Sequence, residues 1–485
     1  MSRSDPSWLA GLRAFVPRAM KAWSVPGMAV AAVQGRRCVM AEGFGLRDRK
    51  RRLPVTPRTL FGIGSVTKAF TATAVGILVD EGRLTWDTPV REVLEGFRLQ
   101  DRVATERTTP RDLLCHRTGL PRHDNAWYGL TLSRRQLFAR LRHLPPSKDF
   151  RSGWQYQNMM FMVAGLVVEA VSGQTWEQFV RTRLFEPLGM RGANCSAAET
   201  QAGDDYALPY KRKAGRAVRT AMDDLSSLGP AGGINAGAAD MARWLLMNLD
   251  GGKVGRTRII SAEALREIHR PQVVVGEPVR WPEMLHPCYG LGWRVEAYRG
   301  HVALTHGGLV NGFQTWIGLL PHAKAGVVAL SNAMGHAAPP AVVYHAFDRM
   351  LGVAPAPWIA RWRKELAAQK AEQGSRRKKS ARRRRATCGP PRELARYAGR
   401  YRHPGYGTMD VRLVDGRLEA HWAGIAHAVR HHHGEVFEMA RPLWEARDLI
   451  TFSPGPDGRI DRLSIPFEQA TGPIVFRRLR PRGDK

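Results

Sequence analysis

Ser65 and Lys68 lie three residues apart, where the short apolar segment FGIG meets an apolar stretch with helical spacing. On a helix this spacing places both side chains on one face. The helix N-terminus favours negative charge that develops beside the serine. Burial against an apolar helix would lower the pKa of Lys68 and leave a neutral amine to take the serine proton. The pair predicts a nucleophile and its base; the alternative is a capped helix with a solvated lysine.

Tyr156 and Asn158 form a second motif that such chemistry needs. The serine–lysine spacing alone is a weak signal, because Ser375 and Lys378 repeat it within a polar, basic segment. Acyl transfer also requires a proton carrier for the leaving group and donors to an oxyanion. The sequence contains one Tyr-x-Asn, at 156–158, and its phenol is a candidate proton carrier. The alternative is a tyrosine that packs in the core ahead of an apolar helix.

The run His306-Gly307-Gly308 forms the third motif. It predicts an edge strand that offers backbone N–H groups, because glycines remove side chains where a substrate backbone can lie alongside. The three motifs occur in order at 65, 156 and 306, so coincidence explains them poorly. For His306 both a substrate-binding and a purely structural role stay open. We expect a site that uses neither a metal nor a cofactor.

Apolar patterns around these motifs predict the elements that hold them. Residues 27–45 alternate as two strands around a Gly-Arg turn, and residues 68–82 have the spacing of a helix that ends at Gly82. Residues 301–331 contain three apolar runs with short loops, as in an antiparallel meander. This order differs from the strand–helix alternation of a parallel sheet. We therefore expect an antiparallel sheet with helices.

Composition divides the chain into three regions. Residues 1–357 hold the three motifs, residues 358–391 are polar and basic, and residues 392–485 consist of short strand-like runs. Between positions 361 and 385, twelve Lys or Arg stand against two Glu. We expect this middle region to begin as a helix and to continue as a flexible linker.

The last region has two Asp-Gly dipeptides between apolar runs, at 415–416 and 457–458. Asp-Gly suits the two-residue type I′ turn of a β-hairpin, since both positions adopt positive φ angles. Short strands with regular turns of this kind predict a small antiparallel barrel. The run His431-His432-His433 is expected on a barrel strand or its exposed loop rather than in a metal site.

Overall composition narrows the class of protein. A chain of 485 residues exceeds what one hydrophobic core usually serves, so at least two domains are expected. The net charge of +31 would attract anionic partners without sequence preference, and no nucleic-acid recognition element accompanies it. Five scattered cysteines without a CxxC pair predict neither a disulfide framework nor a zinc knuckle.

Two features bear on location. The N-terminal residues lack the basic segment, apolar core and cleavage site of a signal peptide. The longest apolar run, residues 159–168, is about half the ~20 residues that a membrane span needs. We therefore expect a cytoplasmic protein without a membrane span.

The motifs and their order resemble those of serine hydrolases of the class C β-lactamase and penicillin-binding-protein superfamily, in particular its β-lactamase-related esterases and peptidases. Further stretches that resemble this group are RDLLCHRTGLPRHD (111–124), LFEPLGM (184–190), GPAGGINAGAADMARWLL (229–246) and YGLGW (289–293). The resemblance implies an α/β (α+β) fold: an αβα sandwich with an antiparallel sheet and a helical subdomain. Some members also carry a lipocalin-like C-terminal barrel, which agrees with the hairpins.

The resemblance also implies roles for the motif residues. Ser65 would be the nucleophile that accepts the acyl group, and Lys68 its proton partner. Tyr156 would act as acid or base for the leaving group, with Lys68 close enough to keep its phenol ionised. Asn158 would position the carbonyl or amide of the substrate.

In the third motif, the implied oxyanion hole consists of the backbone N–H groups of Ser65 and Leu309, the residue after Gly307 and Gly308. His306 stands where β-lactamases and penicillin-binding proteins usually have lysine. A histidine is charged only part of the time near neutral pH, so this difference argues against β-lactam hydrolysis.

The function that follows is hydrolysis of a small ester, a short or D-residue-containing peptide, or a β-lactam-like substrate through an acyl-Ser65 intermediate. The alternative is a catalytically silent scaffold that uses its basic surface. The oligomeric state is left open, with a homo-oligomer as one possibility.

The loops at 121–130 and 270–287 would set the shape of the pocket. His116 and Asp124 are expected to shape a loop near the site.

Overall fold

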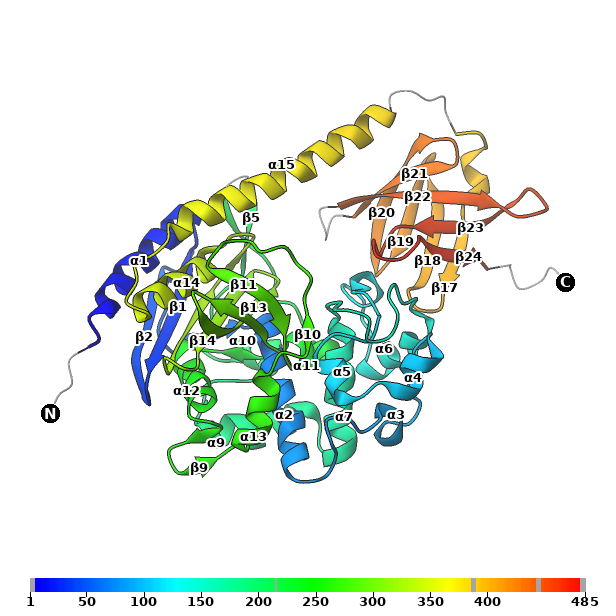
Figure 1. Cartoon of the computed structure of the whole chain (residues 1–485). Helices are drawn as coiled ribbons and strands as arrows, with labels where there is room; N and C mark the ends of the chain where they lie inside the picture. Colours follow the sequence, from blue (N-terminus) through cyan, green and yellow to red (C-terminus); the bar gives the residue numbers. More distant parts are fainter. Residues whose placement is uncertain (1–4, 214–215, 385–389, 442–445, 480–485) are drawn as a thin grey trace.

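The computed structural model describes residues 5–213, 216–384, 390–441 and 446–479. Its first part centres on a nine-stranded antiparallel sheet in the order β10-β11-β12-β13-β14-β15-β1-β2-β3 (Figure 1). The strands of this sheet are β1 (Gly27–Gln34), β2 (Arg37–Asp48), β3 (Leu53–Pro54), β10 (Val273–Val274), β11 (Met284–Tyr289), β12 (Arg294–Tyr298), β13 (His301–Val310), β14 (Phe313–Leu320) and β15 (Ala325–Ser331). The two-strand and meander predictions for 27–45 and 301–331 are confirmed.

Strand β1 shows why the sheet needs helices on both faces. Its side chains alternate between two separate cores, with Ala29, Ala31 and Val33 in one and Met28 and Val30 in the other. Because successive side chains of a strand point to opposite faces, a strand that is buried throughout must be covered twice. The sheet is therefore the middle layer of an αβα sandwich.

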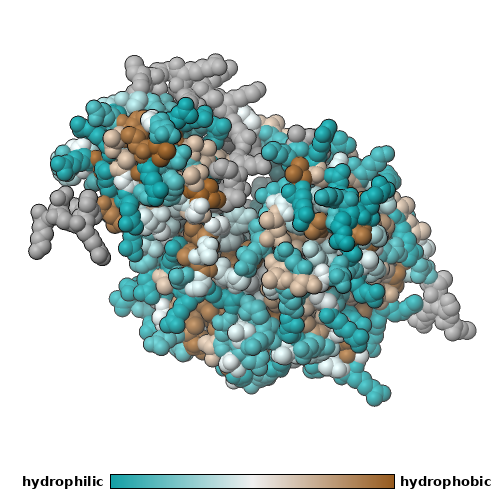
Figure 2. Space-filling model, turned by 180° about the vertical axis from the view of Figure 1, so that it is seen from behind, coloured by the Kyte–Doolittle hydropathy of each residue, from teal (hydrophilic) through white to brown (hydrophobic). Residues whose placement is uncertain are grey.

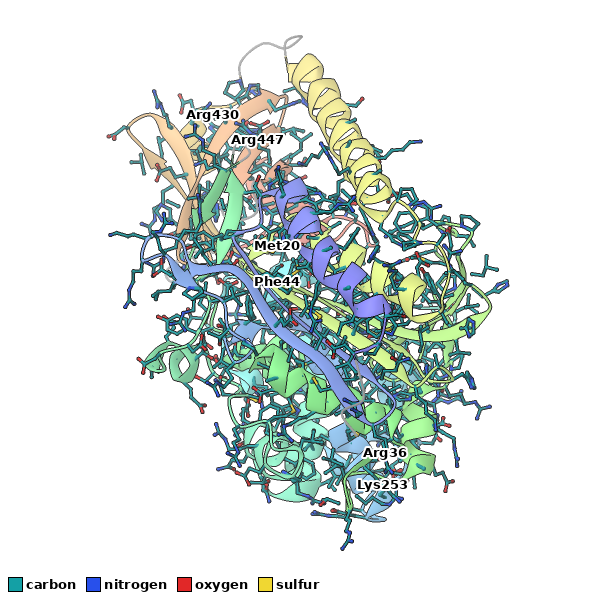
Figure 3. All side chains as sticks on the ribbon, turned by 90° about the vertical axis from the view of Figure 1, so that its left-hand side faces the viewer. Met20, Arg36, Phe44, Lys253, Arg430 and Arg447 are labelled. Atoms are coloured by element: carbon teal, nitrogen blue, oxygen red, sulfur yellow. The ribbon has the colours of Figure 1, made fainter. Side chains whose placement is uncertain are left out.

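Helices α1 (Trp8–Trp23) and α14 (Ala338–Met350) cover one face of the sheet. Figure 3 shows Met20 of α1 beside Phe44 of β2 in this layer. On the other face lie α12 (Ala238–Leu249), α2 (Thr67–Asp80) and α13 (Ala262–His269). Helix α2 ends where the sequence predicted, since Gly82 has a φ of +69°.

A helical region packs on the far side of α2. It surrounds α7 (Asn158–Ser172), whose apolar residues are almost all buried. The other segments of this region are α3 (Val90–Val93), α4 (Arg102–Arg107), α5 (Pro110–Leu114), α6 (Arg134–Arg140), α8 (Trp176–Val180) and α9 (Glu186–Leu188). The fold is thus the sandwich with a helical subdomain that the sequence predicted.

No single helix among the described residues combines the length and apolarity of a membrane span. One pair of helices, Asn158–Ser172 and Trp176–Leu188, reaches that length and apolarity only jointly, across an 80° bend.

Helix α15 (Trp358–Arg384) extends from the sandwich toward the side where the barrel lies (Figure 1). Its start is anchored, because Trp358 is buried and its indole N–H donates to Asp348 at 2.7 Å. The helix continues through Arg384, so most of the expected flexible linker is helical. The boundaries of the three regions stay predictions.

The C-terminal part is a closed eight-stranded antiparallel barrel. Its strands are β17 (Gly399–His403), β18 (Gly407–Val414), β19 (Arg417–Trp422), β20 (Ile425–His433), β21 (Val436–Arg441), β22 (Ala446–Pro454), β23 (Ile460–Ile465) and β24 (Ile474–Arg478). Buried aromatic side chains fill its interior; they are Tyr397, Tyr401, Tyr406, Trp422, Phe437, Phe452, Phe467 and Phe476. The predicted barrel is confirmed, and the histidine run lies on β20.

The two Asp-Gly turns differ. Asp415 and Gly416 have φ angles of +47° and +71°, which confirms the type I′ turn. At 457–458 the two-residue turn is wrong: β22 ends at Pro454 and β23 begins at Ile460. A Gly455 N–H donates to the Arg459 carbonyl at 2.8 Å and closes a longer loop, in which only Gly458 of the dipeptide has a positive φ.

Candidate active site

Ser65 lies in a short turn, Gly64–Val66, between strand β4 (Phe61–Gly62) and helix α2. Gly64 has a φ of +52°, and a Cβ there would lie 2.6 Å from the Leu309 backbone nitrogen. A Cβ at Gly308 would lie 1.9 Å from the Ile63 carbonyl oxygen. Glycines on both sides therefore let β13 press against the turn that carries Ser65, which brings the first and third motifs together.

The room left by the glycine pair is taken up within the protein. The missing side chain at Gly308 accommodates the Ile63 carbonyl, and a Cβ at Gly307 would lie 2.7 Å from the Trp316 ring. The glycine pair in the sequence predicts room for a substrate backbone. Close packing of the protein itself explains the glycines instead, although both residues also line the pocket described below.

Lys68 is fully buried, so the alternative of a solvated lysine is wrong. Its Nζ lies 2.8 Å from Asn158 Oδ1, 2.7 Å from the Ala231 carbonyl and 3.1 Å from Ser65 Oγ. Burial holds its pKa well below the ordinary value, and the nearby Arg122 charge lowers it further. A neutral amine has two N–H donors, which the two carbonyl oxygens accept. Its lone pair then faces Ser65 and can take the serine proton.

Tyr156 and Asn158 flank Gln157, the N-cap residue of α7. The Gln157 side chain accepts from the Met159 N–H at 2.8 Å and caps the helix, while the Gln157 backbone N–H donates to His116 Nδ1 at 3.1 Å. This cap fixes the two neighbouring side chains, which lie on the side of Lys68. Asn158 contacts Lys68 directly, and the Nζ of Lys68 lies 4.9 Å from the centre of the Tyr156 ring.

The Tyr156 phenol lies in the same pocket lining as Ser65. Burial raises its pKa to about 12, and the influence of Ser65 and the Arg122 charge only partly oppose this. A neutral Lys68 supplies no charge to ionise the phenol, so the expectation of a phenolate held by Lys68 does not fit this geometry. The neutral phenol is placed to give a proton to a leaving group.

His306 lies behind Tyr156, with ring centres 6.4 Å apart, and is buried. Its Nδ1 faces the Gly307 carbonyl at 2.8 Å and its Nε2 faces the Tyr289 hydroxyl at 2.9 Å. A carbonyl only accepts, so Nδ1 carries the proton and Nε2 accepts from Tyr289. Burial lowers the pKa of His306 to about 3. The ring is neutral near pH 7 and offers no positive charge to a substrate.

A pocket of about 510 Å³ brings most of the predicted site residues together; its lining includes Ser65, Tyr156, Asn158, Gly307, Gly308 and Leu309, but not Lys68 or His306. Aromatic and acidic side chains that the sequence analysis did not single out also line it; they are Trp127, Tyr128, Trp316 and Asp223. Arg122 lies with its guanidinium 5.0 Å from the centre of the Tyr156 ring and pairs with Asp124 at 2.7 Å. The resemblance of residues 111–124 to the family predicted that this stretch lies near the site. It did not show which of these residues line the pocket, because that depends on the fold.

The described residues contain no group of three or more His, Cys, Asp or Glu side chains arranged to hold a metal ion.

Comparison with protein families matches residues 12–346 to the β-lactamase family and residues 383–478 to a domain of unknown function, DUF3471. The chain is 30% identical to unguisins hydrolase ungD′ of Aspergillus campestris, over 94% of this chain and 89% of that protein. It is 31% identical to penicillin-binding protein 4 of Amycolatopsis lactamdurans, over 63% of this chain and 80% of that protein.

Solved structures share the fold. An octameric penicillin-binding protein homologue from Pyrococcus abyssi superposes with a TM-score of 0.64 at 24% identity, over 97% of this chain and all of that one. A class C β-lactamase from Rhodobacter sphaeroides gives 0.58 at 20% identity, over 70% of this chain and 98% of that one. The family match spans most of the chain and agrees with the sheet, the helices and the three motifs. The chain therefore belongs to the β-lactamase family and is a serine hydrolase.

Proposed function

We propose that Ser65 attacks the carbonyl carbon of an ester or amide and forms an acyl-enzyme that water then hydrolyses. The observation that carries this is the buried Lys68 amine, with two carbonyl acceptors and the Ser65 hydroxyl within 3.1 Å. As Oγ bonds to the carbonyl carbon, its proton passes to Lys68. No other described side chain beside Ser65 combines such proximity with a neutral basic nitrogen.

The leaving group departs as the tetrahedral intermediate collapses. The Tyr156 phenol, which lines the same pocket as Ser65, supplies the proton that the amine or alcohol takes, and it recovers one through Lys68. The backbone N–H groups of Ser65 and Leu309 are the proposed oxyanion donors, supported by the close approach of Leu309 to Gly64. Water then attacks the acyl carbon and releases the acid and the free serine.

Among substrate classes, short peptides and small esters fit better than β-lactams. The neutral, enclosed His306 lacks the charge that would attract a β-lactam carboxylate. A hydrolase named for unguisins shares 30% identity over almost the whole chain, which supports hydrolysis of a natural amide or ester. D-residue-containing peptides stay within the proposal.

The test is intact-mass spectrometry after brief exposure to p-nitrophenyl acetate, a fluorophosphonate and a penicillin, with Ser65→Ala as the control. We expect an adduct on Ser65 and a burst of p-nitrophenol, both lost in the variant. Acylation by the ester and fluorophosphonate without penicillin turnover would fit the neutral His306. A folded protein that forms no adduct with any reagent would refute the proposal and favour the silent scaffold.

A further inference from the structure

The loop Arg122–Asn125 joins the active site to the C-terminal barrel, and its side chains alternate between the two. Arg122 and Asp124 line the pocket. His123 and Asn125 are buried and make their hydrogen bonds toward the barrel and the neighbouring loop. The loop is therefore in contact with both parts of the molecule at once.

Four hydrogen bonds from the barrel hold the two inner residues. The His123 N–H donates to the Glu468 carboxylate at 2.8 Å, and the Tyr406 hydroxyl lies 2.6 Å from His123 Nδ1. Asn125 donates to the Phe467 carbonyl at 2.8 Å and accepts from Arg441 at 2.5 Å. Such a set, made to buried side chains, fixes the backbone between them.

The backbone of His123 also requires support. Its φ of +46° lies in the left-handed region, which a residue with a side chain adopts only when its surroundings impose it. Its Nε2 faces the Pro145 carbonyl at 2.9 Å, so Nε2 carries the proton and Nδ1 accepts from Tyr406. The barrel thus supplies part of what keeps this residue in a strained conformation.

The two pocket-lining residues of the loop, Arg122 and Asp124, face the side chains of the proposed active site. Arg122 lies over the Tyr156 ring, and the Asn158 amide donates to Asp124 at 3.4 Å. The Arg122 charge lowers the pKa of both Lys68 and Tyr156, and the Asp124 charge raises both. A displacement of this ion pair would change the protonation of the site and the place of Asn158.

Other titratable groups face Tyr156 from different elements. They are His116, His306 and Tyr289, with the His116 ring centre 4.4 Å from that of Tyr156. Burial lowers the pKa of both histidines and raises that of Tyr289, so all three stay neutral near pH 7. The Arg122–Asp124 pair is therefore the charged neighbour that a loop movement would act on.

We propose that the barrel is a positioning element of the active site, in which Tyr406, Glu468 and Arg441 hold the Arg122–Asn125 loop so that Arg122 and Asp124 keep their places beside Tyr156 and Asn158. This inference rests on the proposed acyl-transfer function. A closed barrel can bind a ligand in its interior, but buried aromatic side chains fill the interior of this one. Positioning of the active-site loop gives the barrel a different role.

The barrel offers a matched pair of substitutions. Tyr406→Phe removes the hydroxyl that contacts His123, whereas Tyr401→Phe removes a hydroxyl that donates to the Tyr397 carbonyl within the barrel at 2.8 Å. Both tyrosines are fully buried. A general loss of barrel stability would affect both variants alike, while an effect through the loop belongs to Tyr406 alone.

The measurement is the pH profile of kcat/KM for p-nitrophenyl acetate, with fluorophosphonate labelling of Ser65 run in parallel. We expect Tyr406→Phe to lower kcat/KM by about threefold to tenfold, the effect of a looser catalytic geometry, and to move the pH midpoint. Tyr401→Phe should match the parent protein. Arg122→Gln should move the midpoint upward, because the charge that lowers the pKa of Lys68 and Tyr156 is gone.

The double variant decides whether Tyr406 acts through Arg122. If it does, the shift of the midpoint that Tyr406→Phe causes becomes smaller in the Arg122→Gln background, where only the Asp124 charge is left to be displaced. Additive shifts, or a Tyr406→Phe profile that matches Tyr401→Phe, would overturn the inference. Glu468→Gln serves as the second variant if Tyr406→Phe does not fold. A parent protein that fluorophosphonate fails to label would instead refute the proposed function, so the two failures are distinguishable.

Discussion

At the scale of single residues, the buried Lys68 amine predicts that catalysis depends on it far more than stability does. Lys68→Met keeps a similar volume and removes the proton acceptor. We expect the p-nitrophenol burst rate to fall about 10²- to 10⁴-fold, the usual contribution of a general base. Thermal unfolding should still be cooperative, because a desolvated amine is replaced by an apolar group. A variant that retains its burst rate would show that another group takes the serine proton.

Buried histidines predict a loss of stability in mild acid. Burial lowers the pKa of His269, His306 and His336 to about 3 each. As the pH is lowered from 6.5 to about 5, the unfolded chain takes up protons that the folded chain does not. The free energy of unfolding therefore decreases as the pH decreases. The slope approaches about 1.4 kcal/mol per pH unit for each such histidine.

Chemical denaturation at several pH values measures this slope. His306→Gln should reduce it by one histidine's share. A free energy of unfolding that stays constant from pH 6.5 to 5 would mean that these rings bind protons in the folded state.

At the scale of elements, the contact between β13 and the Ser65 turn predicts a steric limit at Gly308. A Cβ there would lie 1.9 Å from the Ile63 carbonyl oxygen. We expect Gly308→Ala to cost about 1–3 kcal/mol of stability and to slow acylation, because the strand must move away from Ser65. Thermal unfolding and burst kinetics test both effects.

Gly374 provides the matched control for that substitution. It lies on α15, and a Cβ there would meet nothing within 4 Å. Gly374→Ala should leave the burst unchanged and stabilise the helix by about 0.5–1 kcal/mol. Equal effects of the two substitutions would contradict the steric argument.

At the scale of the whole molecule, the charge of +31 predicts binding to polyanions that depends on salt and not on sequence. On the face shown in Figure 2, hydrophilic side chains cover most of the surface, and hydrophobic ones form separate groups. We expect two unrelated DNA duplexes to bind with equal affinity at low salt, and both affinities to fall at least about tenfold between 50 and 200 mM salt.

Fluorescence anisotropy with the two duplexes measures these affinities. A clear preference for one duplex, retained at 200 mM salt, would contradict non-specific attraction and assign a recognition role to the basic surface.

A homo-oligomer remains a prediction; the octameric neighbour from Pyrococcus abyssi shares the fold at 24% identity.

The sequence by itself determined the features that depend on short-range geometry. The order of the motifs around Ser65, Tyr156 and His306, the end of α2 at Gly82 and the turn at Asp415-Gly416 follow from side-chain type and local backbone preference. Alternation in β1 and in the meander likewise predicted an antiparallel sheet. These features need no information about distant parts of the chain.

Tertiary structure alone decided the features that depend on burial and on contacts between distant segments. The neutral state of His306 follows from its burial, and the position of the Arg122–Asn125 loop follows from barrel residues more than 280 positions further along the chain. The loop at 455–459 is a local example. Its Asp-Gly dipeptide predicted a two-residue turn, but the pairing of β22 with β23 places the dipeptide in a longer loop. A pKa or a contact of this kind is set by what packs around a group, and neighbouring residues in the sequence do not specify that packing.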